Sequence, residues 1–155
     1  MKRIATDEVQ DFEIEHQNIV RKYAPESMVL LKNDNILPLN HPGKIALYGN
    51  GARNTIKGGT GSGDVNVRHF VTVEEGLEQD GFEITTKRWL YQYSELKANY
   101  VKKFKEELVA KAKAEGKDVW VATMGVTPLE PDYDLDLSSS SQAEAAVYVL
   151  ARDSG

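Results

Sequence analysis

The sequence predicts an α/β fold with a mostly parallel sheet flanked by helices. Short apolar runs, which are typical of buried strands, recur along the chain. Segments whose apolar residues recur at helical spacing separate these runs. Because strands that alternate with helices form parallel sheets covered on both faces, this alternation favours the α/β class. Right-handed crossovers between the strands follow from the same assignment.

Composition indicates one soluble globular domain and argues against several functions. The chain has 155 residues, of which 41% are hydrophobic and 28% charged, enough for one buried core. Its formal net charge of −5 argues against a nucleic acid partner and against a polybasic membrane contact. Without cysteine, a disulfide framework or a thiol nucleophile is excluded. Residues 28–31, the longest apolar run, are too few to span a bilayer, and residues 1–16 are unlike a secretory signal. We therefore expect a cytoplasmic protein.

Residues 1–40 predict a helix followed by an extended tether. Pro25 interrupts the helical pattern, so either the helix kinks there or a second helix begins with Pro25 at its first position. Residues 33–35 are expected to end the helical region. Residues 37–39 then form an extended tether before a turn at residues 41–43. The apolar stripe of this helical region comprises Ile19, Val20, Tyr23, Ser27, Leu30 and Leu31.

Residues 45–48 form the first predicted strand, which runs into a long loop rich in glycine. The apolar run is too short for a helix. Beyond the loop, Thr72 has the residue type of a helix N-cap, with Glu74 and Glu75 placed favourably against the helix dipole. This short helix is expected to end at Gly81. The glycines of the loop are Gly49, Gly51, Gly58, Gly59, Gly61 and Gly63.

Residues 82–85 predict a second strand, which is followed by a longer helix. We expect Ser94 to cap this helix and Gly116 to end it. The lysines and glutamates between residues 102 and 113 are interpreted as its solvated face. Its apolar face comprises Leu96, Tyr100, Phe104, Leu108 and Ala112.

Two further strands are predicted near the end of the chain, at residues 119–124 and 145–151. Between them, residues 127–141 are acidic and then rich in serine, and their two prolines favour an exposed loop. The carboxylates of this loop do not match the calcium spacing of an EF-hand, so we interpret them as solvated. They are Glu130, Asp132, Asp134 and Asp136. The isolated His16 and His41 predict no metal site.

The glycine-rich loop is the strongest candidate for a binding site, because loops that follow strands of an α/β sheet usually carry the ligand. A Walker A loop needs a lysine that residues 61–64 lack, and a dinucleotide fingerprint needs a third glycine that residues 49–54 lack. A binding loop and a plain connection without ligand are therefore both kept as alternatives, and no cofactor is expected. A polar cluster in the loop could bind sugar hydroxyls or pair internally; its members are Asp64, Asn66, Arg68 and His69.

Several segments carry a resemblance to a known family. They are residues 26–33 with 37–39, residues 45–49, residues 57–66, residues 73–77 with 81–82, and residues 146–152 with Ser154 and Gly155. In this order they resemble the helix and tether, first strand, glycine-rich loop, helix with second strand, and last strand of one domain. That domain is the α/β sandwich of glycoside hydrolase family 3, the family of many β-glucosidases. Residues 94–117 match least well.

The resemblance implies an incomplete, three-layer α/β sandwich from a retaining glycosidase that acts on β-linked glycosides. Such an enzyme uses a carboxylate nucleophile and a carboxylic acid/base about 5 Å apart. The resemblance implies a nucleophilic Asp on a separate TIM-barrel domain, which this chain lacks, and an acid/base Glu directly after a Ser-Gly like Ser154 and Gly155. No residue of the chain is therefore assigned a catalytic role. The candidate substrate-binding residues are Gly58, Gly59, Thr60, Gly61, Ser62, Gly63, Asp64, Asn66 and Arg68.

We thus expect residues 1–155 to be a single partial domain, with a leading helix and tether at residues 1–40 and an α/β core at residues 44–155. The resemblance implies a carbohydrate substrate and a barrel domain as partners in the full-length enzyme. The isolated chain is expected to be inactive. A non-catalytic nucleotide- or sugar-binding Rossmann-like module is the alternative. Because the elements that would cover the last strand are absent, we expect self-association of the chain.

Overall fold

The computed structural model describes residues 6–58, 63 and 65–152, which divide into two compact units, Met1–Asn40 and His41–Gly155. In the first unit, helix α1 (Asp11–Tyr23) is followed by a 3-10 helix, η1 (Ala24–Ser27), which carries Pro25 near its start. The predicted second helix is therefore a single 3-10 turn. Met28 is already extended, with φ −93° and ψ 138°, so the helical stripe predicted to reach Leu30 and Leu31 is wrong there. Proline lacks the amide proton that a continuous α-helix requires.

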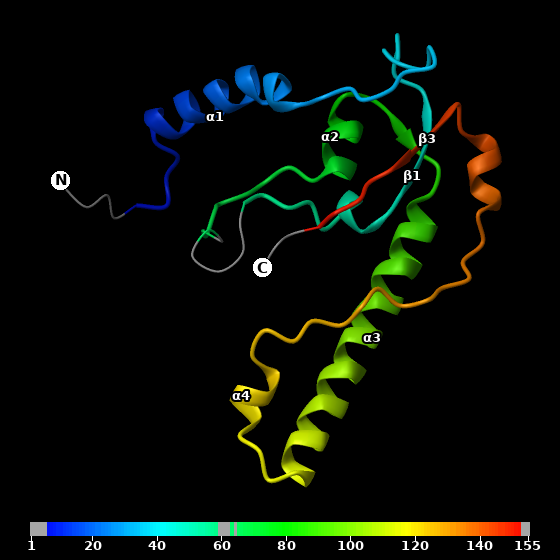
Figure 1. The fold of residues 1–155 in the computed structure, drawn as a ribbon. Helices are drawn as coiled ribbons and strands as arrows, with labels where there is room; N and C mark the ends of the chain where they lie inside the picture. The colour runs from blue at the N-terminus through cyan, green and yellow to red at the C-terminus, as the bar shows by residue number, and fades with distance from the viewer. Residues whose placement is uncertain (1–5, 59–62, 64, 153–155) are drawn as a thin grey trace. The chain divides into compact units, whose positions relative to one another are not determined.

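The second unit contains a parallel sheet of three strands, β1 (Lys44–Tyr48), β2 (Glu83–Ile84) and β3 (Ala145–Tyr148), in the order β2-β1-β3 (Figure 1). Ile45 pairs with Ile84 on one side and with Ala145 on the other, and the pairing with β3 ends at Tyr48 and Tyr148. The prediction of a mostly parallel sheet flanked by helices is confirmed, and the structure is consistent with an incomplete α/β sandwich.

The core of the second unit surrounds β1. The side chains of Ile45, Ala46, Leu47 and Tyr48 are all buried. Because successive side chains of a strand point to opposite faces, this burial shows that both faces of β1 are covered. Helix α3 (Lys87–Ala114) contributes buried residues to one face, since the Trp89 ring meets the Tyr48 ring edge-on with centroids 4.9 Å apart. The central strand is thus fixed from both sides, as its continuous apolar run predicts.

A buried threonine hydroxyl extends the short ladder between β1 and β2. The backbone pairing of β2 ends at Thr85, whose amide donates to the carbonyl of Ile45 over 2.9 Å. At the next position, Thr86 is completely buried, and its Oγ1 accepts from the Leu47 amide at 2.8 Å and donates to the Leu47 carbonyl at 2.7 Å. The chain can therefore leave the sheet and begin α3 without leaving the polar groups of Leu47 unpaired.

Helix α3 starts earlier than the sequence predicts. Thr86 occupies its N-cap position, so the expectation that Ser94 caps it is wrong. Ser94 lies inside the helix, where its hydroxyl donates to the carbonyl of Leu90 over 2.8 Å. Its predicted end is nearly right, because the last helical residue is followed by Glu115 and then Gly116 at φ +66°. In the described part of the chain, none of the helices is both long enough and apolar enough to cross a membrane.

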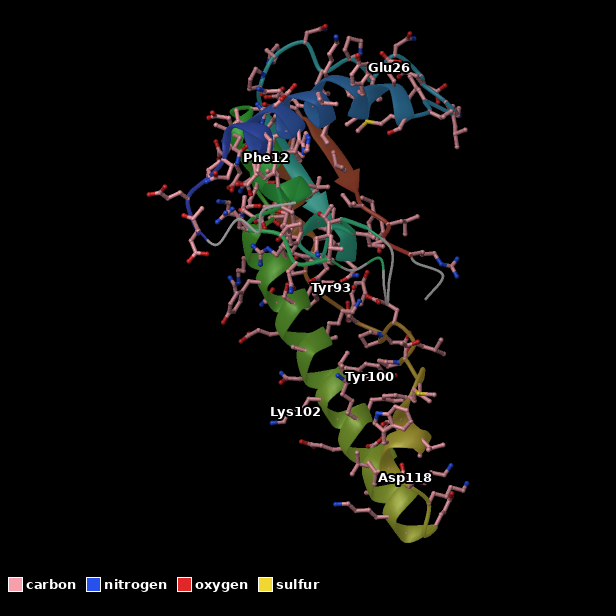
Figure 2. All side chains as sticks on the ribbon, turned by 90° about the vertical axis from the view of Figure 1, so that its left-hand side faces the viewer. Phe12, Glu26, Tyr93, Tyr100, Lys102 and Asp118 are labelled. Atoms are coloured by element: carbon pink, nitrogen blue, oxygen red, sulfur yellow. The ribbon has the colours of Figure 1, made fainter. Side chains whose placement is uncertain are left out.

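The predicted strand at residues 119–124 is wrong, because these residues form helix α4 (Val119–Thr123) beside the end of α3 (Figure 1). Asp118 caps this helix by accepting a hydrogen bond from the Val121 amide over 2.9 Å (Figure 2). Trp120 and Val121 are 70% and 63% exposed, so the apolar run is not a buried strand. A short apolar run fits either structure, and the aspartate cap favours the helix.

Residues 127–141 were predicted as an exposed loop, which is only partly right. The segment includes the start of a 3-10 helix, η4 (Ser138–Gln142), and Pro131 is buried. Tyr133 contacts α3, with its ring centroid 5.8 Å from that of Trp89 and 5.3 Å from that of Tyr93. Aromatic contacts therefore attach the acidic segment to the first half of α3, where Tyr93 lies (Figure 2).

Candidate functional site

The candidate site lies at the carboxyl ends of β1 and β3. These strands are adjacent and parallel, so the segments that follow them leave the sheet at the same edge. The connection after β1 leads to β2 on one side, whereas β3 lies on the other side of β1. Ligands of α/β proteins usually bind at such a reversal of strand order.

Two glycines allow the segment after β1 to cross close to the segment after β3. Gly49 has φ +90°, and a Cβ atom there would lie 2.4 Å from the carbonyl oxygen of Val149. The amide of Gly51 donates to the same carbonyl over 3.1 Å, and a Cβ atom on Gly51 would lie 2.6 Å from Cγ1 of Val149. A larger side chain at either position would separate the two segments. The first turn of the predicted glycine-rich loop is therefore built against the extension of β3.

The glycine-rich loop is only partly described. Gly59, Thr60, Gly61, Ser62 and Asp64, predicted to bind substrate, lie outside the described residues.

Among the described candidates, Gly58 and Gly63 come close together, because a Cβ atom on Gly58 would lie 3.1 Å from the Gly63 carbonyl oxygen. Asn66 and Arg68 are exposed. His69, the last member of the predicted polar cluster, has its Nε2 atom 3.8 Å from a carboxylate oxygen of Glu75. The described part of the loop thus presents polar side chains to solvent, next to the first turn of the following helix.

An ion pair and a hydroxyl, neither identified from the sequence, attach this loop to helix α2 (Val73–Gln79). Arg53 donates from Nε and Nη2 to the two carboxylate oxygens of Glu74, over 2.5 and 2.8 Å. The hydrogen bond to Glu74 raises the pKa of Arg53. Further along the chain, the Thr55 hydroxyl donates to the Gly51 carbonyl over 2.7 Å and accepts from the Val73 amide over 3.1 Å.

The start of α2 is capped as the sequence predicts. Thr72 accepts a hydrogen bond from the Glu75 amide over 3.1 Å, and its own amide donates to the Glu75 carboxylate over 2.9 Å. This reciprocal capping box satisfies two amides that a helix start otherwise leaves unpaired. The hydrogen bond from the Thr72 backbone lowers the pKa of Glu75. The chain therefore passes from the glycine-rich loop into a helix start that is held by the capping box.

The carboxylate of Glu130 is engaged by side chains of α3. It accepts hydrogen bonds from the Tyr93 hydroxyl and, over 3.0 Å, from the Lys97 ammonium. Partial burial raises the pKa of Glu130 and lowers the pKa of Lys97. A hydrogen bond to Tyr148 is the main reason that the pKa of Tyr133 rises to about 12. Glu130 is thus a structural contact of its segment, unlike the fully solvated carboxylate that the sequence suggests.

Among the described residues, no group of three histidines or carboxylates is placed to hold a metal ion. Separately, the described part of the loop offers a polar ligand backbone groups and the exposed side chains of Asn66 and Arg68. Hydroxyl-rich molecules suit such donors and acceptors.

Comparison with known proteins gives one family and several relatives. The model of the glycosyl hydrolase family 3 C-terminal domain matches residues 28–153. Beta-glucosidase A of Butyrivibrio fibrisolvens is 46% identical over 65 residues, which is 41% of this chain and 8% of that protein. Probable beta-glucosidase I of Aspergillus fumigatus is 39% identical over 84 residues, 53% of this chain and 10% of that protein. Probable beta-glucosidase D of Emericella nidulans is 32% identical over 111 residues, 56% of this chain and 13% of that protein.

The chain thus spans about a tenth of the length of the curated relatives that it matches. No solved structure matches it significantly.

Proposed function

Because the chain belongs to the family of glycosyl hydrolase family 3 C-terminal domains, we propose that it is the accessory α/β domain of a β-glucosidase-type retaining glycosidase. In this proposal the whole enzyme hydrolyses β-linked glycosides, and its barrel domain supplies the nucleophile. The similarity to three proteins named as β-glucosidases supports this choice of substrate class.

The single observation that carries the proposal is the edge formed by β1 and β3. The glycine-rich loop follows β1, and the segment toward Ser154 and Gly155 follows β3, so both leave the sheet side by side. A retaining glycosidase needs its acid/base next to the groups that bind the sugar. The proposed acid/base position after Gly155 and the proposed sugar-binding loop would therefore serve one site.

The same proposal assigns no catalysis to the isolated chain. The catalytic nucleophile and the acid/base of the whole enzyme are proposed to lie outside residues 1–155. The chain itself is proposed to bind the hydroxyls of the sugar through the glycine-rich loop, with Asp64, Asn66 and Arg68 as the polar side chains.

The test uses a protein that contains this domain together with the proposed barrel. Asp64→Ala should lower the turnover of an aryl β-glucoside while the melting temperature stays near that of the parent protein. Asp132→Ala is the matched control, since this exposed aspartate lies on the segment beside α3. If Asp64→Ala lowers the melting temperature but leaves turnover per folded molecule unchanged, the loop is scaffold and the proposal is wrong.

We further propose that the isolated chain self-associates through β3. This strand lies at the edge of the sheet, and its residues alternate between half-buried and exposed. Tyr148 and Leu150 are 58% and 79% exposed, so apolar side chains lie along the outer strand of the described sheet, where another chain can pair. Sedimentation velocity at high micromolar concentration should detect a dimer or larger species, and Leu150→Lys should shift the equilibrium toward monomer. A clean monomer of the unaltered chain would contradict this proposal.

A further inference from the structure

The glycine-rich loop has both of its ends attached to one place, the first turn of α2. The outgoing chain is held there by the Arg53–Glu74 ion pair and by the Thr55 hydroxyl. The returning chain enters the same turn through the capping box at Thr72. Attachments of this kind restrict the conformational freedom of the residues next to them. The loop is therefore constrained at both ends before any ligand binds.

The ion pair in this attachment is more sheltered than the Lys87–Glu78 pair, whose glutamate lies on the same helix. The side chains of Arg53 and Glu74 are 30% and 13% exposed, whereas those of Lys87 and Glu78 are 57% and 37% exposed. Solvent and salt screen a sheltered pair less than an exposed one. The planar guanidinium also binds both carboxylate oxygens at once, which fixes the direction of the contact as well as its length.

The attachment lies where it can influence the candidate site. Arg53 directly follows the turn in which Gly51 donates to the carbonyl of Val149, on the extension of β3. A shift at Arg53 would move the start of the loop relative to that extension. Ligand affinity rises when a loop is already held in its bound position, because less ordering is then required on binding.

We propose that Arg53 and Glu74 are positioning residues that hold the glycine-rich loop in place for a sugar at the β1/β3 edge. This inference rests on the proposed function for the sugar, whereas the anchoring of the loop stands on the contacts alone. The pair acts through the loop backbone, and neither side chain is required to contact the sugar.

Amide hydrogen–deuterium exchange of the 155-residue chain tests the anchoring. Glu74→Gln should make the amides of residues 55–58 and 65–71 exchange about tenfold faster, because it removes the charge from a hydrogen-bonded carboxylate. Arg53→Lys should have a similar effect, since lysine keeps the charge but cannot form the two-point contact. Amides of β1 and α3 should keep their protection in both variants. Glu78→Gln is the matched control on the exposed pair and should leave the loop unchanged.

Titration with D-glucose, followed through the backbone amide signals of Asn66 and Arg68, tests the link to the sugar. The unaltered chain should show saturable shifts, and Glu74→Gln should bind about tenfold more weakly if pre-organisation contributes to affinity. Loop exchange in Glu74→Gln equal to that in Glu78→Gln would overturn the anchoring, whatever the sugar result. Faster loop exchange with no response of the unaltered chain to glucose would overturn the sugar role and leave the anchor intact.

Discussion

Replacing Thr86 by valine should test how the sheet and helix α3 are joined. Valine has nearly the shape of threonine, so the change replaces the buried hydroxyl by a methyl group and removes its hydrogen bonds. The amide and carbonyl of Leu47 then each lose a partner, at 2.8 and 2.7 Å from Thr86 Oγ1. An unsatisfied buried polar group costs about 1–3 kcal/mol. Two such groups are left, and the surrounding chain can move slightly to reduce the loss. We therefore expect Thr86→Val to lower the free energy of unfolding by about 2–4 kcal/mol.

Urea unfolding followed by circular dichroism measures this loss. With a slope of about 2 kcal/mol per molar urea, the middle of the usual range, the unfolding midpoint should fall by about 1–2 M. Thr85→Val is the matched control, because the Thr85 hydroxyl lies 3.4 Å from the carbonyl of Ile45, which already accepts from the Thr85 amide. The control should cost less than about 0.5 kcal/mol. Equal losses in the two variants would refute the assigned role of the Thr86 hydroxyl.

Two further predictions concern the segments that border the candidate site. Gly49→Ala should destabilise the chain by about 2–4 kcal/mol in urea unfolding, because φ is +90° and the new Cβ would lie 2.4 Å from the Val149 carbonyl oxygen. Gly63→Ala, where the new Cβ meets nothing within 4 Å, should be near neutral, and similar losses in both would contradict this account. Folding lowers the pKa of Glu75, so its contribution is present above its unfolded pKa and is lost as the pH falls through its lower folded pKa. Glu75→Gln, which can keep the capping box with Thr72, should flatten the acid side of the stability–pH curve below about pH 4.5, and an unchanged curve would disprove the assignment.

The elements that sequence patterns predict best are those with strong local signals. The apolar run at residues 45–48 is short and continuous, as a strand buried on both faces requires, and the structure has β1 there. Thr72 followed by Glu75 is the pattern of a capping box, and both hydrogen bonds of the box are present. Gly116 after the last turn of α3 adopts the positive φ that favours glycine.

Features with an ambiguous local pattern, or that depend on distant partners, could not be predicted. The run at residues 119–124 fits a strand or a helix equally well, and only the Asp118 cap distinguishes them. The hydroxyl of Thr86 makes hydrogen bonds to Leu47 that the backbone of a longer β2 would otherwise make. Such a side-chain contact leaves no periodic signal in the sequence. Arg53 and Glu74 are 21 positions apart and lie on different elements, so no local rule connects them. The same limit applies to the site, where the glycines of the loop and the Thr72 cap were recognised but the Arg53–Glu74 and Thr55 contacts were not.

We propose that this domain shapes a sugar site whose catalytic carboxylates lie elsewhere in the enzyme. Hydrolysis of an aryl β-glucoside by the isolated 155-residue chain tests it most directly. We expect no hydrolysis above the buffer rate from the chain alone, and hydrolysis once the domain is joined to a barrel that carries the nucleophile. Clear hydrolysis by residues 1–155 would contradict the account, because a catalytic carboxylate pair would then have to lie within this chain.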